Sequence, residues 1–286
     1  MYSRFKTLNN YKLEKIQSSI AVIVGLGATG SVIAEHLARH GLDLILIDRD
    51  YLEQNDLYSS NLYSREQVEK ALPKAKAAEE RLSELTDIDS HIVNLNSDNI
   101  ELLSSADIIL DGTDNIETRY LIDEYSKENG IPWIYTAALG ERGFSMFIEE
   151  ACFKCMFNQV KPKESCETNG VLREIPNIAA STSCIKALKH LTGEEVEEKL
   201  EIIPEMDDFT PAECSCSERR EIEASNVCGE DKYQVFGDSI PEEFRGEVIA
   251  SNNYLKRLEF QGHMLTVFES GRAIIEAESL EEAERL

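Results

Sequence analysis

The chain has 286 residues, of which 42% are hydrophobic, and its 54 acidic and 29 basic side chains give a formal net charge of −25. This length suits one large α/β domain with a small appendage, and the acidic charge argues against a nucleic-acid partner because it would repel a phosphate backbone. The N-terminus has no apolar signal segment and no run reaches about 18 apolar residues, so we expect a cytoplasmic protein without a membrane partner. The seven cysteines then favour metal or thiol chemistry over disulfides.

The first strong pattern is a β-branched run at 20–24 that leads into a glycine-rich turn and an apolar helical pattern at 29–40. In this arrangement the first glycine allows the turn, the second lets a phosphate approach the backbone, and the third lets the helix pack closely on the strand. The turn residues expected to contact a nucleotide are Gly25, Gly27, Ala28 and Gly30. A second strand ends at Asp48, 23 residues after Gly25, where an acidic residue usually binds a ribose hydroxyl. The alternative is a close-packed turn without a ligand.

Strands and helices alternate through the first half of the chain. A helical lead-in over 1–19 precedes the first strand, and a polar loop over 50–63 follows the second. The next expected elements are a helix over 65–85 interrupted by Pro73, strands at 91–95 and 106–111, a helix at 115–129 and a strand at 133–137. This alternation predicts a doubly wound, mostly parallel sheet of the Rossmann type, in which ligands bind outside the carboxyl ends of the strands.

The pattern changes after residue 143. We expect a strand at 144–148, a polar loop at 158–173, a helix at 175–191 and a charged helix at 194–201. A small α+β appendage follows, with strands at 254–260, 264–268 and 273–276 and a last helix opened by a capping box at Ser279. The sequence thus predicts a nucleotide-binding domain over 1–229 and an appendage over 230–286. The chain ends inside the last helix, which leaves open a longer natural protein.

Polar side chains follow the strand at 106–111. Asp111, Asp114 and Asn115 offer carboxylate and amide oxygens of the kind that Mg²⁺ prefers. The alternative is that Asp114 or Asn115 only caps the following helix. Lys74, on the helix over 65–85, could reach phosphates as a point charge, or be an ordinary solvated lysine.

Several short motifs occur in uninterrupted order over residues 1–229. Besides the glycine turn they are Tyr2-Ser-Arg4, Asp48-x-Asp50, Asn55-Asp56-Leu57, Pro73-Lys74-x-Lys76, Asp111-Gly-Thr-Asp114-Asn115-x-x-x-Arg119, Cys152-x-x-Cys155 and Cys166-Glu-Thr-Asn-Gly170-Val. In this order they resemble the ThiF/MoeB/HesA family of adenylyltransferases, which are related to ubiquitin-activating enzymes. Agreement of several separate motifs is far more specific than the glycines alone.

The resemblance implies that ATP and Mg²⁺ bind at the strand ends. The C-terminal glycine carboxylate of a ubiquitin-like sulfur carrier would attack the α-phosphate, release pyrophosphate and form an acyl-adenylate. By this resemblance Asp48 binds the ribose, Lys74 binds phosphate and Asp114 binds magnesium. Nucleotide contacts are also implied for Asp50, Asp111 and Asn115.

The resemblance further implies protein partners. Arg4 matches an arginine that reaches the nucleotide across the interface of a homodimer. Cys166 matches a thiol in a mobile crossover loop, which takes part in sulfur or thioester chemistry in some members. The carrier would serve a molybdopterin, thiamine or tRNA-thiolation pathway, with a sulfurtransferase or cysteine desulfurase as a further partner.

The resemblance also implies a structural zinc site. Cys152 and Cys155 form the first pair of thiolates, and the second pair of the family would end at Cys228. The partner position in that second pair holds Ser225, so Cys216, or else Cys214, has to supply the fourth thiolate of a closed tetrahedral site. The alternative is that the later cysteines are small buried hydrophobic residues.

One departure from the family pattern concerns the phosphates. The family usually reads Asn-Leu-x-Arg-Gln where this chain reads Asp56-Leu-Tyr-Ser59-Ser60, so a phosphate-neutralising arginine is replaced by Ser59. Arg65, six residues further on, could compensate from the loop. Without compensation, the chain is expected either to be a slow enzyme or to be a nucleotide-binding adaptor with weakened catalysis. An NAD(P)-dependent oxidoreductase, which would use the same glycine turn, is a further alternative.

Overall fold

The computed structural model describes residues 12–153, 170–203, 224–226, 232–236, 246–251, 255–268 and 272–286. The chain divides into two compact units, Met1–Asp208 and Phe209–Leu286, and each is built on its own sheet. Among the described helices, none combines the length and the apolar character needed to cross a membrane.

The first unit is built on a sheet whose described strands follow the order β3-β2-β1-β4-β5-β6-β7. They are β1 (Ile20–Val24), β2 (Asp43–Ile47), β3 (Ile88–His91), β4 (Ile108–Asp111), β5 (Trp133–Leu139), β6 (Arg142–Ile148) and β7 (Glu201–Ile203). The strands from β3 to β5 in this order are parallel to one another. β6 pairs antiparallel with β5, and β7 pairs antiparallel with β6. The chain leaves β1 toward β2 and β3 and later returns on the other side of β1 with β4. Ligands bind at such a reversal of strand order, outside the carboxyl ends of the strands.

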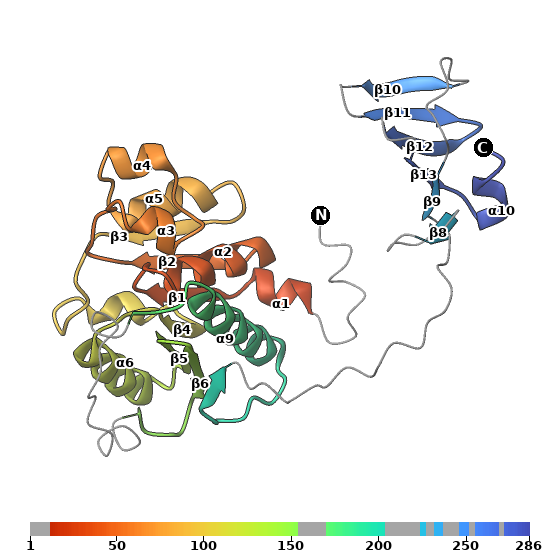
Figure 1. Ribbon diagram of the computed structural model, residues 1–286. Coiled ribbons are helices and arrows are strands. Elements are labelled where there is room, and N and C mark those ends of the chain that lie inside the picture. The colour runs from red at the N-terminus through yellow and green to blue at the C-terminus, as the bar shows by residue number, and fades with distance from the viewer. Residues whose placement is uncertain are drawn as a thin grey trace, which may run out of the picture. The chain divides into compact units, whose positions relative to one another are not determined.

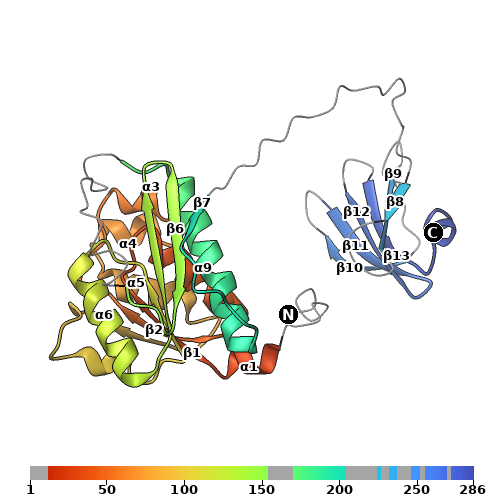
Figure 2. The same cartoon turned by 90° about the horizontal axis from the view of Figure 1, so that it is seen from below.

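Helices cover both faces of this sheet (Figures 1 and 2). The described α-helices of the unit are α1 (Leu13–Gln17), α2 (Gly30–His40), α3 (Asp56–Ser59), α4 (Arg65–Glu69), α5 (Lys74–Leu82), α6 (Ile116–Asn129) and α9 (Glu174–Thr192). Because helices pack on both faces, the parallel strands are buried on both sides. This burial explains their nearly continuous runs of Val, Ile and Leu.

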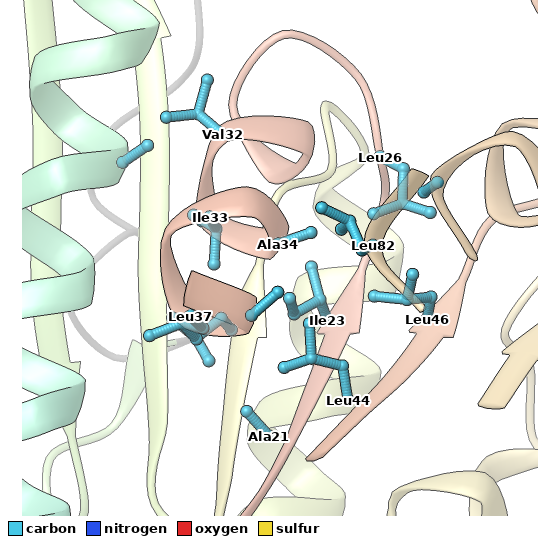
Figure 3. Close-up of a cluster of buried hydrophobic side chains, with 14 of the residues drawn as sticks. Ala21, Ile23, Leu26, Val32, Ile33, Ala34, Leu37, Leu44, Leu46 and Leu82 are labelled. Atoms are coloured by element: carbon cyan, nitrogen blue, oxygen red, sulfur yellow. The ribbon is translucent and has the colours of Figure 1, made fainter. Parts of the chain in front are cut away.

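The two faces of β1 show how the core is divided. Ala21 and Ile23 pack with α2, α5 and α9, and Figure 3 shows Ile33 and Leu37 of α2 in this cluster. Val22 and Val24 pack on the opposite face with α6 and with the buried tryptophan of β5. Because side chains alternate along a strand, this short segment joins both halves of the core.

Most elements expected in the first unit are present. The strand at 20–24 is β1, and the expected α6 begins after Asn115 and ends at Gly130, which has a left-handed φ of 67°. The helix expected over 65–85 is divided into α4 and α5 at Pro73, which has no N–H to donate within a helix. A short helix, α3, lies inside the expected loop over 50–63.

Two predicted elements differ from the structure, one in its position and one in its existence. The third strand was expected at 91–95, but β3 is Ile88–His91 and pairs with β2 over those residues. The charged helix expected over 194–201 does not occur: residues 194–200 are irregular and Glu201 begins β7. Val196 and Leu200 of this segment pack against two different core clusters, and the Glu198 carboxylate accepts the N–H groups of residues 149–151 at 2.6–2.9 Å.

The second unit contains an antiparallel sheet in the order β10-β11-β12-β13-β9-β8 over its described strands. They are β8 (Ala224–Asn226), β9 (Lys232–Phe236), β10 (Glu247–Ser251), β11 (Leu255–Phe260), β12 (His263–Phe268) and β13 (Arg272–Glu276), followed by the helix α10 (Leu280–Ala283). Its core includes Leu258, Leu265 and Ile275. The second unit begins at Phe209, and within it β8 pairs with β9.

Candidate functional site

Three glycines bring the backbone of the turn after β1 into contact with the end of β4. Gly25 has a φ of 85°, and a Cβ atom added to Gly30 would lie 1.8 Å from the Gly25 carbonyl oxygen. A Cβ atom on Gly112 would lie 2.7 Å from that same oxygen. Such distances are too short for any side chain, so these positions require glycine. Gly112 follows β4 directly, and its packing role was not recognised in the sequence.

Gly27 is in a different environment from its two neighbours in the turn. A Cβ atom added there would meet nothing within 4 Å. Within the described residues no hydrogen bond takes up the N–H groups of Gly27 and Ala28. The turn therefore offers open backbone donors at the start of α2, an arrangement suited to a phosphate group.

Asp48 lies directly after β2 and is tied to the glycine turn. Its Oδ2 atom accepts the Leu26 N–H at 2.6 Å, and its Oδ1 atom accepts the Asp50 N–H at 2.7 Å. Burial raises the pKa of Asp48 above its ordinary value, and the two backbone hydrogen bonds offset part of this shift. The carboxylate is fixed beside the turn, where a ribose would lie if a phosphate occupied the turn. The side chain of Asp50 is exposed.

Lys74 begins α5 and lies at the same edge of the sheet. Its N–H donates to the Asp50 carbonyl oxygen at 2.9 Å, and its Nζ atom lies 3.3 Å from Oδ1 of Asp56. Both side chains are largely buried, with 14% of Lys74 and 11% of Asp56 exposed. Lys74 is therefore not an ordinary solvated lysine. Its charge is balanced by Asp56, at the position where the family pattern has asparagine.

Asp111, at the end of β4, is fully buried and holds the backbone of its own motif. Its Oδ2 atom lies 2.8 Å from Nε of Arg119, and its Oδ1 atom accepts the Thr113 N–H at 2.9 Å. Arg119 also bonds the Thr113 carbonyl oxygen and lies 4.9 Å from the centre of the Tyr135 ring. Burial alone would lower the pKa of Arg119, but Asp111, Tyr135 and Asp114 together raise this pKa above its ordinary value. Both Asp111 oxygens are thus engaged in positioning this loop.

Asn115 and Asp114 have separate environments. The Asn115 Oδ1 atom accepts the Thr118 N–H at 3.0 Å, so Asn115 caps α6. Asp114 is exposed, and no hydrogen bond to its carboxylate occurs within the described residues. A single accessible carboxylate beside a phosphate site fits Mg²⁺, which is commonly bound by one or two carboxylates together with substrate phosphates.

The other expected site residues lie largely outside the described part of the chain. Arg4, Cys155, Cys166, Cys216 and Cys228 are all outside it, and Cys214, the alternative zinc ligand, is as well. Cys152 is described, and its Sγ atom lies 3.9 Å from Oδ2 of Asp123. Over the described residues no three or more His, Cys, Asp or Glu side chains are grouped to hold a metal ion. The zinc site stays a prediction.

Comparison with known protein families matches residues 2–228 to the ThiF family. A sulfur carrier protein ThiS adenylyltransferase of Bacillus subtilis is 30% identical over 299 aligned positions, which cover 92% of this chain and 89% of that relative. The ThiS adenylyltransferase of Escherichia coli is 29% identical, with 68% of this chain and 82% of that protein covered. An adenylyltransferase and sulfurtransferase MOCS3 of Xenopus laevis is 28% identical over 63% of this chain, which spans 42% of that longer protein.

Solved structures show the same fold at lower identity. Escherichia coli MccB with ATP has a TM-score of 0.55 and is 18% identical, with 66% of this chain and 64% of that chain covered. PaaA has a TM-score of 0.56, is 18% identical, and is matched over 69% of this chain and 64% of its own.

Proposed function

Because this chain belongs to the ThiF family, we propose that it uses ATP to adenylate the C-terminal glycine of a ubiquitin-like sulfur carrier protein. The names of its relatives in Bacillus subtilis and Escherichia coli, both ThiS adenylyltransferases, support this reaction. The observation that carries the proposal is the position of Asp114. This accessible carboxylate follows Gly112, whose backbone contacts the phosphate-type turn at Gly25 and Gly30.

In the proposed reaction a carboxylate oxygen of the carrier attacks the α-phosphorus of ATP. The bond from that phosphorus to the bridging oxygen breaks, and pyrophosphate leaves with the electron pair. Mg²⁺, when bound, would neutralise phosphate oxygens and help to orient the leaving group. The chain's own contribution is to position the nucleotide and to balance its charge.

Each described residue of the site then has one role in binding the nucleotide or the magnesium ion. The open N–H groups of Gly27 and Ala28 face a phosphate, and the fixed carboxylate of Asp48 accepts the ribose hydroxyls. Lys74 has further ammonium donors beyond the pair with Asp56, so it can contact a phosphate while it stays near that carboxylate. Asp114 is the proposed magnesium ligand, and Asp111 positions the loop that carries it.

A nucleotide-binding adaptor is a second candidate, and one observation favours it. The cations of the described site at Lys74 and Arg119 are both paired with carboxylates, at 3.3 and 2.8 Å, and residue 59 is serine. A site with little unbalanced positive charge would hold a triphosphate without strongly stabilising the transition state. Family membership disfavours the other alternative, an NAD(P)-dependent oxidoreductase.

Pyrophosphate exchange tests the proposed reaction directly. With ATP, Mg²⁺ and a carrier ending in Gly-Gly, the chain is expected to incorporate labelled pyrophosphate into ATP, because adenylate formation is reversible. Exchange should require the carrier, and calorimetry should show binding of MgATP and not of NAD. Tight NAD binding without ATP binding would refute the site, whereas ATP binding without exchange for any carrier would favour the adaptor.

We further propose a homodimer in which Arg4 of one subunit completes the site of the other. Mixing Arg4→Ala chains with Asp114→Ala chains is expected to restore part of the exchange activity. One of the two sites in a mixed dimer would contain both native residues, whereas each variant alone would have none. The measurement is exchange activity after subunit exchange has been verified with tagged chains. Absence of recovery, or a monomer in sedimentation, would contradict the cross-subunit role.

A further inference from the structure

Arg173, the residue directly before α9, reaches a distant loop of the chain. Its Nε atom donates to the Tyr58 carbonyl oxygen at 2.6 Å, and its Nη2 atom donates to Oδ1 of Asn61. These two acceptors are the first and last residues of the loop of residues 58–61, which begins in the last turn of α3 and contains Ser59. An arginine far away in sequence thus holds the segment in which the family arginine is missing.

The loop of residues 58–61 belongs to the edge of the sheet that carries the glycine turn. The Ser60 hydroxyl donates to the Ser31 hydroxyl of α2 at 2.9 Å, and the Tyr63 hydroxyl, just beyond the loop, donates to the Leu26 carbonyl oxygen at 2.7 Å. The first contact reaches the first turn of α2, and the second reaches the glycine turn that leads into it. The loop is therefore fixed beside the proposed phosphate position.

The start of α9 lies at this same edge. Gly140 follows the carboxyl end of β5, and it exchanges hydrogen bonds with the segment before Arg173: its N–H donates to the Gly170 carbonyl oxygen at 3.0 Å, and its own carbonyl oxygen accepts the Leu172 N–H at 2.9 Å. Arg173 is therefore anchored at the ligand-binding edge of the sheet.

Arg173 differs from the other cations at the site in the groups that its side chain binds. Within the described residues it bonds only neutral oxygens, whereas Lys74 and Arg119 are paired with carboxylates. A guanidinium group has more N–H donors than these two bonds use. Arg65, the residue considered from sequence, begins α4 and is exposed, as Arg173 is, but its side chain makes no hydrogen bond to the loop of residues 58–61 within the described residues.

We propose that Arg173 replaces the missing arginine at residue 59 and that its guanidinium contacts the terminal phosphates of bound ATP. This inference rests on the proposed function, since it concerns the same nucleotide. Arg173 would hold the loop with two of its donors and bind phosphate with the others. The positive charge is then supplied by the residue before α9 instead of by residue 59 at the end of α3.

Calorimetry with ATP and AMP tests this role in the full chain. Arg173→Gln is expected to weaken MgATP binding about tenfold or more and to leave AMP binding unchanged, because the lost contact is charge-assisted and involves phosphates that AMP lacks. Arg173→Lys should keep most of the ATP affinity, since it keeps the charge. Arg39→Gln is the matched control: Arg39 lies in the last turn of α2 and pairs with Glu35 at the surface.

A second substitution separates a phosphate contact from a purely structural one. Adding Ser59→Arg to Arg173→Gln should restore ATP affinity, because the charge returns to the position where the family has it. Equal losses of ATP and AMP binding, no loss of either, or no rescue by Ser59→Arg in a folded chain would overturn the inference. If the unaltered chain bound neither nucleotide, the proposed function itself would fail. Unchanged ATP binding by Arg173→Gln would refute only the role of Arg173.

Discussion

Replacing Asp114 with asparagine is expected to lower carrier-dependent pyrophosphate exchange about a hundred- to a thousandfold. A ligand of the catalytic magnesium supports charge stabilisation of several kcal/mol, at about 1.4 kcal/mol per tenfold in rate. The fold should change little, because Asp114 is exposed and Asn115 provides the cap of α6. The free energy of unfolding is therefore expected to stay within about 0.5 kcal/mol.

Glu117→Gln provides the control for the loss of charge. Glu117 lies in the first turn of α6, is also exposed, and has no proposed contact with the nucleotide. Both substitutions remove one negative charge near the same helix end, so a general effect on the helix dipole or on the field of the site would appear in both. Full exchange activity in Asp114→Asn, or an equal loss in both variants, would remove Asp114 from the magnesium site.

Gly30→Ala is expected to destabilise the first unit by about 3 kcal/mol or more. The added Cβ atom would lie 1.8 Å from the Gly25 carbonyl oxygen, and backbone cannot move aside as a flexible side chain does. The clash would separate α2 from the turn and disturb the contact with Gly112, so the effect should lie at or beyond the upper end of overpacking costs. Denaturant unfolding measures this loss.

Gly27→Ala separates the ligand role of the turn from its packing role. A Cβ atom there meets nothing within 4 Å, so the free energy of unfolding should stay within about 1 kcal/mol of the unaltered chain. The methyl group would occupy the space through which a phosphate approaches the backbone, so MgATP binding should weaken. Gly27→Ala with unchanged ATP affinity would contradict this approach, and Gly30→Ala with unchanged stability would contradict the packing argument.

The first half of the fold could be predicted because local and global signals agree there. The run at 20–24 is β-branched, buried on both faces and followed by glycines that only a strand-turn-helix unit requires. Likewise Asn115 and Gly130 mark the two ends of α6 by the chemistry of helix caps. Such positions are determined by residues next to them in the sequence.

The errors arose where distant contacts decide the structure. Residues 194–200 have a charged composition that suits a solvated helix, but the Glu198 carboxylate binds backbone N–H groups of residues 149–151. The third strand begins at Ile88, before the expected segment, because its register is set by pairing with β2. The residues within each of these segments do not indicate the distant contact that it makes.

In the candidate site, too, some features could be predicted from local motifs and others depend on contacts between distant segments. The roles implied for Asp48 and Lys74 rest on motifs; in the structure Asp48 accepts a hydrogen bond from the glycine turn, and Lys74 donates its N–H to Asp50. The close packing of Gly112, the Asp56 partner of Lys74 and the reach of Arg173 to residues 58–61 each join segments that are far apart in sequence. Sequence motifs identify the kinds of residue at a site, whereas the pairing of their charges requires the fold.

Trp133 makes the two units distinguishable in spectroscopy. It is the only tryptophan of the chain, is fully buried in β5, and lies edge-on to the Phe153 ring with centroids 5.3 Å apart. Its fluorescence therefore reports unfolding of the unit that contains β1 to β7, whereas far-ultraviolet circular dichroism reports both sheets. Stabilisation by a nucleotide can thus be followed at Trp133 without interference from the melting of the second sheet.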